Sequence, residues 1–419
     1  MKRRVLITGL GPVTSLGMGK TEFWNRLVNG DKPQLSIVPQ NTYCAKSQFY
    51  VPFPTLNLAD YGIPSYYDFL QPEDKLAIIG AKLALEDAGF ALTTTNKTFG
   101  VAGEAGFATL IGTGFTGFET AFHSYLAHLG IDYFSRASGK KVSFNRMVIP
   151  LSMNNSPAAW ISILYGLRGE SFVSSASCAS GTYSIGQAYR LIADGYQEVV
   201  ITGGVENLQD DSFIIHRGFD VLGALTKSPT GDPQPFSKNR SGFLFAEGGG
   251  CILVLEEMQH AQNRNAPVYA EIMNYCSNSD AHNIVHMQPE GRQILSLFQN
   301  LLKGMKIDYL NAHGTATITN DEIEAAVIQD YFGVAAKQPI INSSKAVLGH
   351  TIGGSGAIEA AITALSLKSG VIHPHLVENP LDNLNLAGET IEKPLGAAAS
   401  VSYGFGGHNA GLLMVKYHA

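Results

Sequence analysis

Residues 172–193 read FVSSASCASGTYSIGQAYRLIA. This stretch predicts a short strand over 172–175 and, from its apolar spacing, a helix over 180–193. Cys178 lies between the two with small side chains on both sides, so that a substrate could approach it closely. A thiol at a helix N-terminus lies near the positive end of the helix dipole, which favours the thiolate. The stretch therefore predicts an exposed nucleophile at a strand-to-helix turn; the alternative is a buried structural cysteine.

Strands and helices alternate on both sides of this unit, which predicts an α/β fold. The chain has 419 residues, which is longer than a chain that folds around one ordinary hydrophobic core. We therefore expect two packed halves. Helical spacing is found over 75–88, before Gly89, and over 356–368. Further strands are predicted at residues 5–8, 98–101, 110–112, 199–202, 251–255, 309–310, 340–342 and 398–402.

Composition excludes several classes of protein. A net charge of −6 argues against broad nucleic-acid binding, which needs a basic surface. The four cysteines form no CxxC pair, which favours free thiols in a reducing compartment. Neither a signal-peptide core nor an apolar run long enough to span a bilayer is present, so we predict a soluble cytoplasmic protein.

Two motifs do not support the function they suggest. Gly9 and Gly11 follow the first strand like a dinucleotide fingerprint, but Thr14 occupies the third glycine position, which favours a tight turn instead. His282 and His286 have the spacing of zinc ligands on a helix without an evident third ligand. We therefore predict no metal site and no bound cofactor.

Two histidines add to the cysteine. His313 lies in the segment 311–317, NAHGTAT, directly after a predicted strand and before a glycine. The segment 343–350, SSKAVLGH, contains Lys345 and ends at His350, again beside glycine. A cysteine combined with histidines is a nucleophilic arrangement found in several classes of enzyme. These residues alone do not select the reaction.

Several ordered segments resemble the elongating beta-ketoacyl-[acyl-carrier-protein] synthases (ketosynthases) of the thiolase superfamily. The similar segments are residues 3–17, the nucleophile turn 177–181, the PFxxxRxGFxxxEG-like segment 235–248, and the segments 311–317, 345–350 and 402–407. The resemblance implies a thiolase-type fold, with two similar α/β halves in a five-layer αβαβα arrangement. Residues 1–255 would form the half with the nucleophile, and residues 256–419 the half with both histidines.

The resemblance also implies the reaction. Cys178 would accept an acyl chain as a thioester. His313 and His350 would hydrogen-bond the thioester carbonyl of malonyl-acyl carrier protein and favour its decarboxylation, and the resulting carbanion would attack the acyl group. Two neutral imidazoles that donate to one oxygen stabilise developing negative charge as an oxyanion hole does. The substrates would arrive on the phosphopantetheine of an acyl carrier protein, and no other cofactor is implied.

Further residues match supporting positions of the family. Lys345 would pair with Glu324, one turn beyond Asp321, and the pair would hold the histidine loop in place. Thr315 and Thr317 would hold the phosphopantetheine arm. The remaining matches are an oxyanion site formed by the backbone N–H groups of Cys178 and Phe405, a gating role for Phe405, and an acyl-pocket role for Phe115.

The Cys–His–His set indicates the subclass. Initiating synthases use Cys–His–Asn, and degradative thiolases have a second cysteine near the C-terminus, whereas this chain has none after Cys276. Short loops near 225–235 and 289–309, and His408 where many members have threonine, leave fatty-acid elongation and a specialised polyene or polyketide pathway both open. A malonyl decarboxylase and a non-catalytic carrier-binding partner are further alternatives.

The expected partners are an acidic acyl carrier protein and a second ketosynthase-like subunit. The subunit would be either a second copy, giving a homodimer, or a chain-length-factor homologue without the nucleophile. Residues 118–150 are aromatic and basic, which suggests an excursion at an interface. Lys140, Lys141 and Arg146 in this excursion are candidates for the carrier-docking patch.

Overall fold

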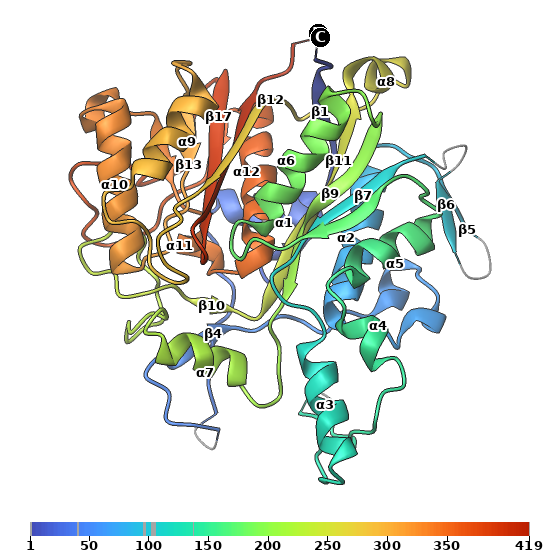
Figure 1. Ribbon diagram of the computed structural model, residues 1–419. Coiled ribbons are helices and arrows are strands. Elements are labelled where there is room, and N and C mark those ends of the chain that lie inside the picture. The colour runs from blue at the N-terminus through green and yellow to red at the C-terminus, as the bar shows by residue number, and fades with distance from the viewer. Residues whose placement is uncertain (1, 40–41, 95–97, 102–105, 137, 419) are drawn as a thin grey trace.

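The computed structural model describes residues 2–39, 42–94, 98–101, 106–136 and 138–418. An 11-stranded sheet runs through the molecule, in the order β14-β13-β17-β18-β12-β1-β11-β9-β7-β8, with the short β2 beside β1 (Figure 1). The strands are β1 (Val5–Thr14), β2 (Gly17–Met18), β7 (Ala108–Gly112), β8 (Ser171–Ser174), β9 (Val199–Asn207), β11 (Gly248–Glu257), β12 (Ala270–Ser279), β13 (Tyr309–Asn311), β14 (Ile340–Asn342), β17 (Ala397–Gly404) and β18 (His408–Val415).

The two ends of this sheet repeat one another. In the first half β7 lies parallel between β8 and β9, and β11 and β1 continue antiparallel. In the second half β13 lies parallel between β14 and β17, and β18 and β12 continue antiparallel. The halves join where β1 pairs with β12, with Val5 opposite Ile272. The prediction of two similar α/β halves is therefore confirmed.

Helices complete five layers. Helices α6 and α12 contact strands of both halves and form the middle layer, whereas α2 and α5 cover the outer face of the first half and α9 and α10 that of the second. These helices are α2 (Pro72–Asp87), α5 (Ser156–Tyr165), α6 (Ser180–Ala193), α9 (Arg292–Leu302), α10 (Ile318–Phe332) and α12 (Ser355–Ser369). The chain passes from the first half to the second between the end of β11 at Glu257 and the start of β12 at Ala270. The division expected from the sequence lies at 255/256.

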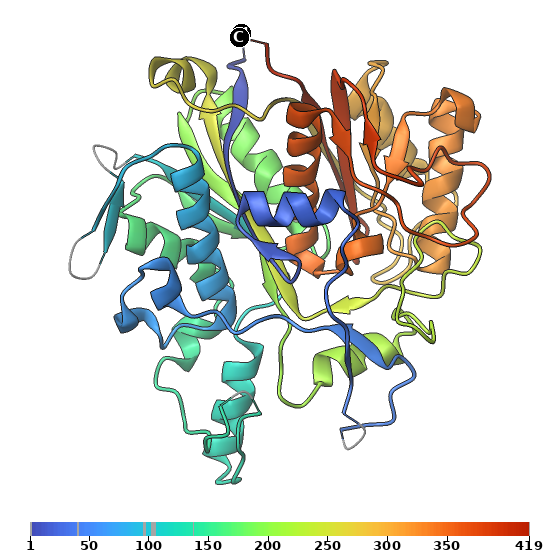
Figure 2. The ribbon, with the colours of Figure 1, turned by 180° about the vertical axis from the view of Figure 1, so that it is seen from behind.

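The remaining elements lie around this framework. Helices α3 and α4 belong to the 118–150 excursion and its end, and project from the lower edge in Figure 1, whereas α1 lies on the opposite side, in front in Figure 2. Among the described residues, no helix combines the length and apolarity needed to cross a bilayer. The other elements are α1 (Lys20–Val28), α3 (Phe118–His128), α4 (Val148–Ser152), α7 (Ile214–Val221), α8 (Met258–Asn263), α11 (Lys345–Leu348), β3 (Ser36–Ile37), β4 (Phe49–Val51), β5 (Leu92–Thr94), β6 (Phe99–Val101), β10 (Phe245–Ala246), β15 (Val371–Ile372) and β16 (Ile391–Glu392).

The first strand corrects one sequence prediction. The tight turn predicted at Gly9 and Gly11 is absent, because β1 continues through both glycines to Thr14. Their missing side chains allow α2 to pack closely: a Cβ at Gly9 would lie 2.1 Å from the Ala84 carbonyl oxygen, and one at Gly11 2.0 Å from that of Gly80. The glycines therefore serve helix–strand packing.

Candidate active site

The nucleophile turn connects β8 to α6. Ser177 adopts a φ of 52°, a left-handed conformation that is uncommon for a residue with a side chain and turns the chain sharply. The Ser180 hydroxyl fixes the turn, because it donates to the Ser177 carbonyl (2.7 Å) and accepts from the Ala176 N–H (2.8 Å). Cys178 is thereby held just before the first turn of α6, as the sequence predicts.

The environment of the Cys178 thiol differs from the expected exposed, activated one. Cys178 is only 7% exposed. Burial raises the pKa of the thiol to about 11, although Ser177, Lys345 and the Phe405 backbone oppose the rise. The desolvation that accompanies burial outweighs these groups, because it penalises the charged form. In the unloaded protein the thiol is therefore protonated near neutral pH.

His313 follows β13 in a loop and is 3% exposed. Its backbone N–H donates to Glu324 at 2.9 Å, and that of Gly314 donates to the same carboxylate at 2.8 Å. The Lys345 Nζ lies 3.4 Å from the Nδ1 of His313 and 2.8 Å from its carbonyl oxygen. Since an ammonium can only donate, Nδ1 is the acceptor and Nε2 carries the proton.

His350 is oriented by Ser355, whose hydroxyl lies 2.9 Å from the imidazole Nδ1. The same hydroxyl accepts from the Thr351 N–H at 3.1 Å. The Nε2 atom of His350 is buried and has no hydrogen-bond partner in the described part of the chain. A buried polar nitrogen without a partner is costly, and such atoms occur at sites that bind a ligand.

One cavity brings the predicted set together. It has a volume of about 310 Å³, and Cys178, His313 and His350 all line it. The two imidazole rings lie edge to face with centroids 5.7 Å apart. Burial and nearby Lys345 hold the pKa of both histidines well below its usual range, so both imidazoles are neutral. The arrangement can stabilise an oxyanion beside a thiol.

Lys345 has a different partner from the one predicted. Its ammonium forms a buried ion pair with Glu359 on α12, and both side chains are almost fully buried. The predicted pairing with Glu324 is wrong because that carboxylate already accepts the two backbone N–H groups of the histidine loop. Glu359 also accepts a hydrogen bond from Ser402 at 3.4 Å.

Asp321 and Glu324 hold the histidine loop through its backbone N–H groups, whereas from the sequence we expect Glu324 to do so by pairing with Lys345. Asp321 accepts from the N–H groups of Ala316 (3.1 Å) and Phe236 (2.6 Å). Burial raises the pKa of Asp321 to about 6 and that of Glu324 to about 7, and the N–H donors oppose the rise. These hydrogen bonds tie the segment 235–248, through Phe236, and the helix α10 to the loop that carries His313.

The other family-matched residues lie at the same cavity. Thr315 and Thr317 line it, and their hydroxyl oxygens are 2.9 Å apart. Phe405 also lines it and lies in the loop between β17 and β18, where Gly406 (φ 85°) and Gly407 (φ 74°) follow. A Cβ at Gly404 would lie 3.1 Å from the Cys178 backbone nitrogen, so this loop approaches the nucleophile turn closely.

Two predictions concern residues away from this cavity. Phe115 is 41% exposed and is not among the residues that line it. Lys140, Lys141 and Arg146 line a separate cavity in the excursion, of about 690 Å³. Among the described residues, Lys227 is the lysine that lines the catalytic cavity.

Sequence reasoning missed three supporting side chains: Glu359, Ser355 and Glu206. Glu206 is buried and accepts from the N–H groups of Gly114, Phe115 and Gly353, each at 2.9 Å. Burial raises its pKa to about 8. The available signal was a single carboxylate within an apolar segment, which must find a partner when buried. Both Glu359, in the predicted apolar helix, and Glu206, in an apolar strand, carry this signal.

Comparisons with known proteins agree with this geometry. The family described as "Beta-ketoacyl synthase, N-terminal domain" matches residues 2–261, and "Beta-ketoacyl synthase, C-terminal domain" matches residues 269–378. The 3-oxoacyl-[acyl-carrier-protein] synthase 2 of Rhizobium meliloti (strain 1021) is 32% identical, with 99% of both chains covered. The structure of the ishigamide ketosynthase/chain length factor is 25% identical with a TM-score of 0.83. A type II PKS acyl-carrier protein in complex with its ketosynthase bound to the hexaketide is also similar, at 25% identity and a TM-score of 0.82. Both structural matches cover 100% of each chain.

The ion pair gives a first prediction. Glu359→Gln leaves Lys345 buried without its counter-charge, and should lower the free energy of unfolding by about 3–5 kcal/mol. Glu322→Gln, an exposed position on α10, is the matched control and should change it by less than about 0.5 kcal/mol. Urea denaturation measures both; equal midpoints for the two variants would contradict the assigned pair.

The buried thiol gives a second prediction. The thiolate is the reactive form, and its fraction rises about tenfold per pH unit below the pKa. Alkylation of Cys178 by iodoacetamide should therefore accelerate about tenfold per unit from pH 7 to pH 10, without a plateau. Peptide mass spectrometry follows Cys178 separately from the exposed Cys44. A plateau at or below pH 8 would mean that the helix N-terminus outweighs burial.

Proposed function

Because this chain belongs to the beta-ketoacyl synthase family, we propose that it joins an acyl group held on Cys178 to malonyl-acyl carrier protein. The products are 3-oxoacyl-acyl carrier protein and carbon dioxide. One observation carries the proposal: Cys178 and two neutral histidines line the same buried cavity, and His350 presents an unpartnered Nε2.

The reaction has two steps. In the first, the Cys178 sulfur attacks the thioester carbonyl of the acyl donor; the acyl group moves to Sγ, and the thiol proton passes to the released pantetheine thiolate. In the second, the malonyl carboxylate leaves as carbon dioxide and its bonding electrons form an enolate. The enolate carbon attacks the acyl–Cys178 carbonyl, the C–S bond breaks, and the Cys178 thiolate takes a proton from solvent.

The histidines act in the second step. As neutral donors, His313 and His350 would hydrogen-bond the malonyl thioester oxygen, where charge develops as the enolate forms. Removing one such donor typically costs about 10²–10³-fold in rate. Lys345 supports this role because it accounts for the tautomer of His313 and helps to keep both rings neutral. The backbone N–H groups of Cys178 and Phe405 would bind the oxygen of the acyl thioester.

The carrier would dock at the mouth of this cavity. The similar solved complex holds an acyl-carrier protein with its ketosynthase, which supports an acyl carrier protein as partner. Thr315 and Thr317 line the cavity and would contact the phosphopantetheine arm. Lys227 lines the same cavity and can attract the phosphate of the arm, whereas Lys140, Lys141 and Arg146 line another one. We therefore propose Lys227 as a contact of the arm and keep Lys140, Lys141 and Arg146 as candidates for the carrier-docking patch.

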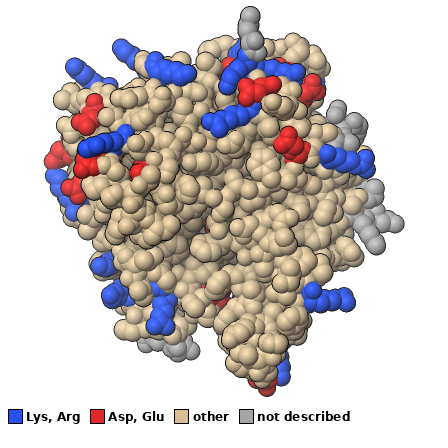
Figure 3. Space-filling model, viewed as in Figure 1, with Lys and Arg blue, Asp and Glu red and all other residues tan. Residues whose placement is uncertain are grey.

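A second ketosynthase-like subunit would cover the face near β8. Within the described residues β8 pairs on one side only, with β7, and an open sheet edge favours strand addition. The middle of the face in Figure 3 carries few charged side chains. Many exposed apolar side chains lie in or next to the connection between β7 and β8. They are Phe115, Phe118, Tyr125, Leu129, Ile131, Phe134, Phe144, Ile149, Met153, Ile163 and Phe172. Such a patch fits a second copy or a chain-length-factor homologue.

The pathway is fatty-acid or polyketide synthesis, and no bound cofactor enters the proposed steps. The four free cysteines fit a reducing compartment, so we propose the cytoplasm. A malonyl decarboxylase would need the histidines but no acyl acceptor. The placement of Cys178 beside them favours condensation.

Acyl transfer to Cys178 gives a third prediction. Mixing the purified chain with acyl carrier proteins of different acyl length should add the acyl mass to Cys178, with a maximum at one length. Intact-protein and peptide mass spectrometry read this directly. Cys178→Ala should take up no acyl group and form no 3-oxoacyl product. Product formation by this variant would overturn the assignment, and release of carbon dioxide without condensation would instead favour the decarboxylase.

Chain length gives a fourth prediction, at Phe115. The loop of this residue contacts the wall of the site: a Cβ at Gly114 would lie 3.5 Å from Ile352, which lines the cavity beside Cys178. Phe115→Ala should therefore extend the accepted acyl chains, seen as a shift of the loading maximum to longer carriers. Phe118→Ala, also exposed and apolar, is the control. An unchanged length profile would remove Phe115 from the acyl pocket.

A further inference from the structure

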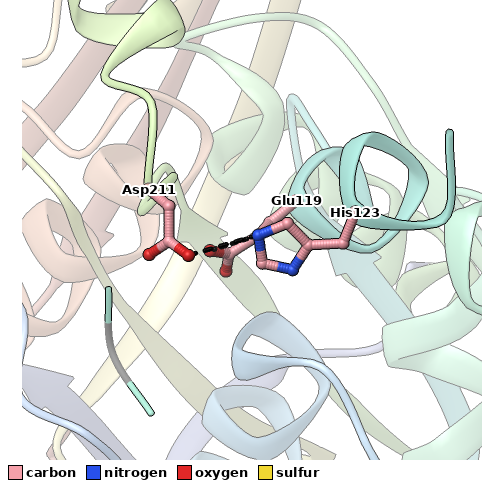
Figure 4. Close-up of side chains that lie close together, drawn as sticks. All are labelled: Glu119, His123 and Asp211. Atoms are coloured by element: carbon pink, nitrogen blue, oxygen red, sulfur yellow. Dashed lines mark ion pairs between the residues drawn. The ribbon is translucent and has the colours of Figure 1, made fainter. Parts of the chain in front are cut away.

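Outside the catalytic cavity, three titratable side chains from two distant parts of the chain converge (Figure 4). Glu119 and His123 lie one turn apart on α3, so that both project from the same face of the helix. Asp211 comes from the segment between β9 and α7. The cluster therefore connects the excursion to the segment that joins β9 to α7.

The geometry of the cluster matches that of metal ligands. The His123 Nε2 lies 3.2 Å from an Asp211 carboxylate oxygen and 3.7 Å from a Glu119 oxygen. One ligand atom from each residue lies within 4.8 Å of the others. Atoms bound to one zinc ion at about 2.0–2.2 Å in tetrahedral geometry are about 3.3–3.6 Å apart. Small side-chain adjustments would bring all three into this range.

Within the described residues, one nitrogen of the cluster lacks a hydrogen-bond partner, whereas Glu119 is hydrogen-bonded to the side chain and backbone of Asp211. The His123 Nε2 is buried and has no hydrogen-bond partner of acceptable geometry in the described part of the chain. The Asp211 side chain is 3% exposed and accepts a hydrogen bond from the Arg136 backbone N–H at 2.8 Å.

Neighbouring cations do not neutralise the two carboxylates. Among the described residues, neither Glu119 nor Asp211 forms an ion pair with a lysine or arginine. The Arg136 guanidinium lies 3.5 Å from Glu247 and stacks over Phe213. Two carboxylates thus face one imidazole nitrogen in a largely buried setting, which a divalent cation would stabilise.

We propose that Glu119, His123 and Asp211 bind one divalent transition-metal ion of the zinc type. One imidazole nitrogen and two carboxylate oxygens suit such an ion, and a water molecule would complete four-coordination. Solvent can reach the cluster, because Glu119 and His123 line the large cavity of the excursion and Glu119 and Asp211 line a smaller one of about 130 Å³.

The metal would have a structural role. It would fix α3 to the segment before α7. Phe213 at the end of this segment and Phe219 in α7 belong to the same apolar cluster as Cys178. It takes no part in condensation, so the inference is independent of the proposed reaction. The competing account is a proton shared between Glu119 and Asp211, which would leave the cluster unable to retain a metal.

Zinc titration of the full chain tests the proposal. The Cys178→Ala variant is used as the background, since the active-site thiol and histidines could themselves bind zinc. After treatment with a chelator and reloading, it should retain one zinc per chain by elemental analysis. Competition with a chromogenic chelator then gives the affinity. His123→Gln and Asp211→Asn should each weaken binding by at least about tenfold.

The matched control is His128→Gln, an exposed histidine on the same helix, which should bind zinc like the background protein. Zinc should also raise the melting temperature of the background and of His128→Gln, but not of His123→Gln. Failure of the background protein to retain zinc would overturn the proposal. Equal affinity in the His123→Gln and His128→Gln variants would overturn it too, because the zinc would then be bound elsewhere.

Discussion

The close approach of α6 and α12 is the constraint on which the rest of the structure depends. A Cβ at Gly181 would lie 2.8 Å from the Ala357 backbone nitrogen, and a Cβ at Gly356 would lie 2.2 Å from the Thr182 hydroxyl. Only hydrogen fits at either position, so the first turns of the two helices touch. Cys178 precedes α6 and His350 precedes α12, and the contact therefore brings the nucleophile and an imidazole to the same cavity. The five-layer packing and the active site have one common origin.

Burial at this contact also determines the charges of the site. The low pKa of both histidines follows from desolvation and from Lys345, so neutral donors are a consequence of the middle layer rather than of a local hydrogen bond. A buried ammonium needs a counter-ion, and Glu359 supplies it from α12 itself. The helix that positions His350 thus also balances the cation that keeps His350 neutral.

The sequence was sufficient to predict the α/β halves, the bounds of α6, and the convergence of Cys178, His313 and His350, because local patterns and ordered motifs carry that information. It was insufficient where tertiary packing decides. Lys345 reaches Glu359 rather than Glu324 because the histidine loop already occupies Glu324. The burial of Cys178, which reverses the expected effect on its pKa, comes from the Phe405 loop and the apolar cluster around it, both distant in sequence. Glu119 and Asp211 are likewise joined only by the fold.

The repeated topology explains how the two halves divide their tasks. In the second half β13 and β14 are joined through α10, whose Asp321 and Glu324 hold the His313 loop by backbone N–H groups. The equivalent connection from β7 to β8 in the first half contains α3 and α4 in addition to α5. That longer connection carries exposed apolar side chains and the Glu119–His123 pair, which lies beside Asp211. The shorter connection therefore fixes geometry at the reacting atoms, whereas no described residue of the longer one lines the catalytic cavity.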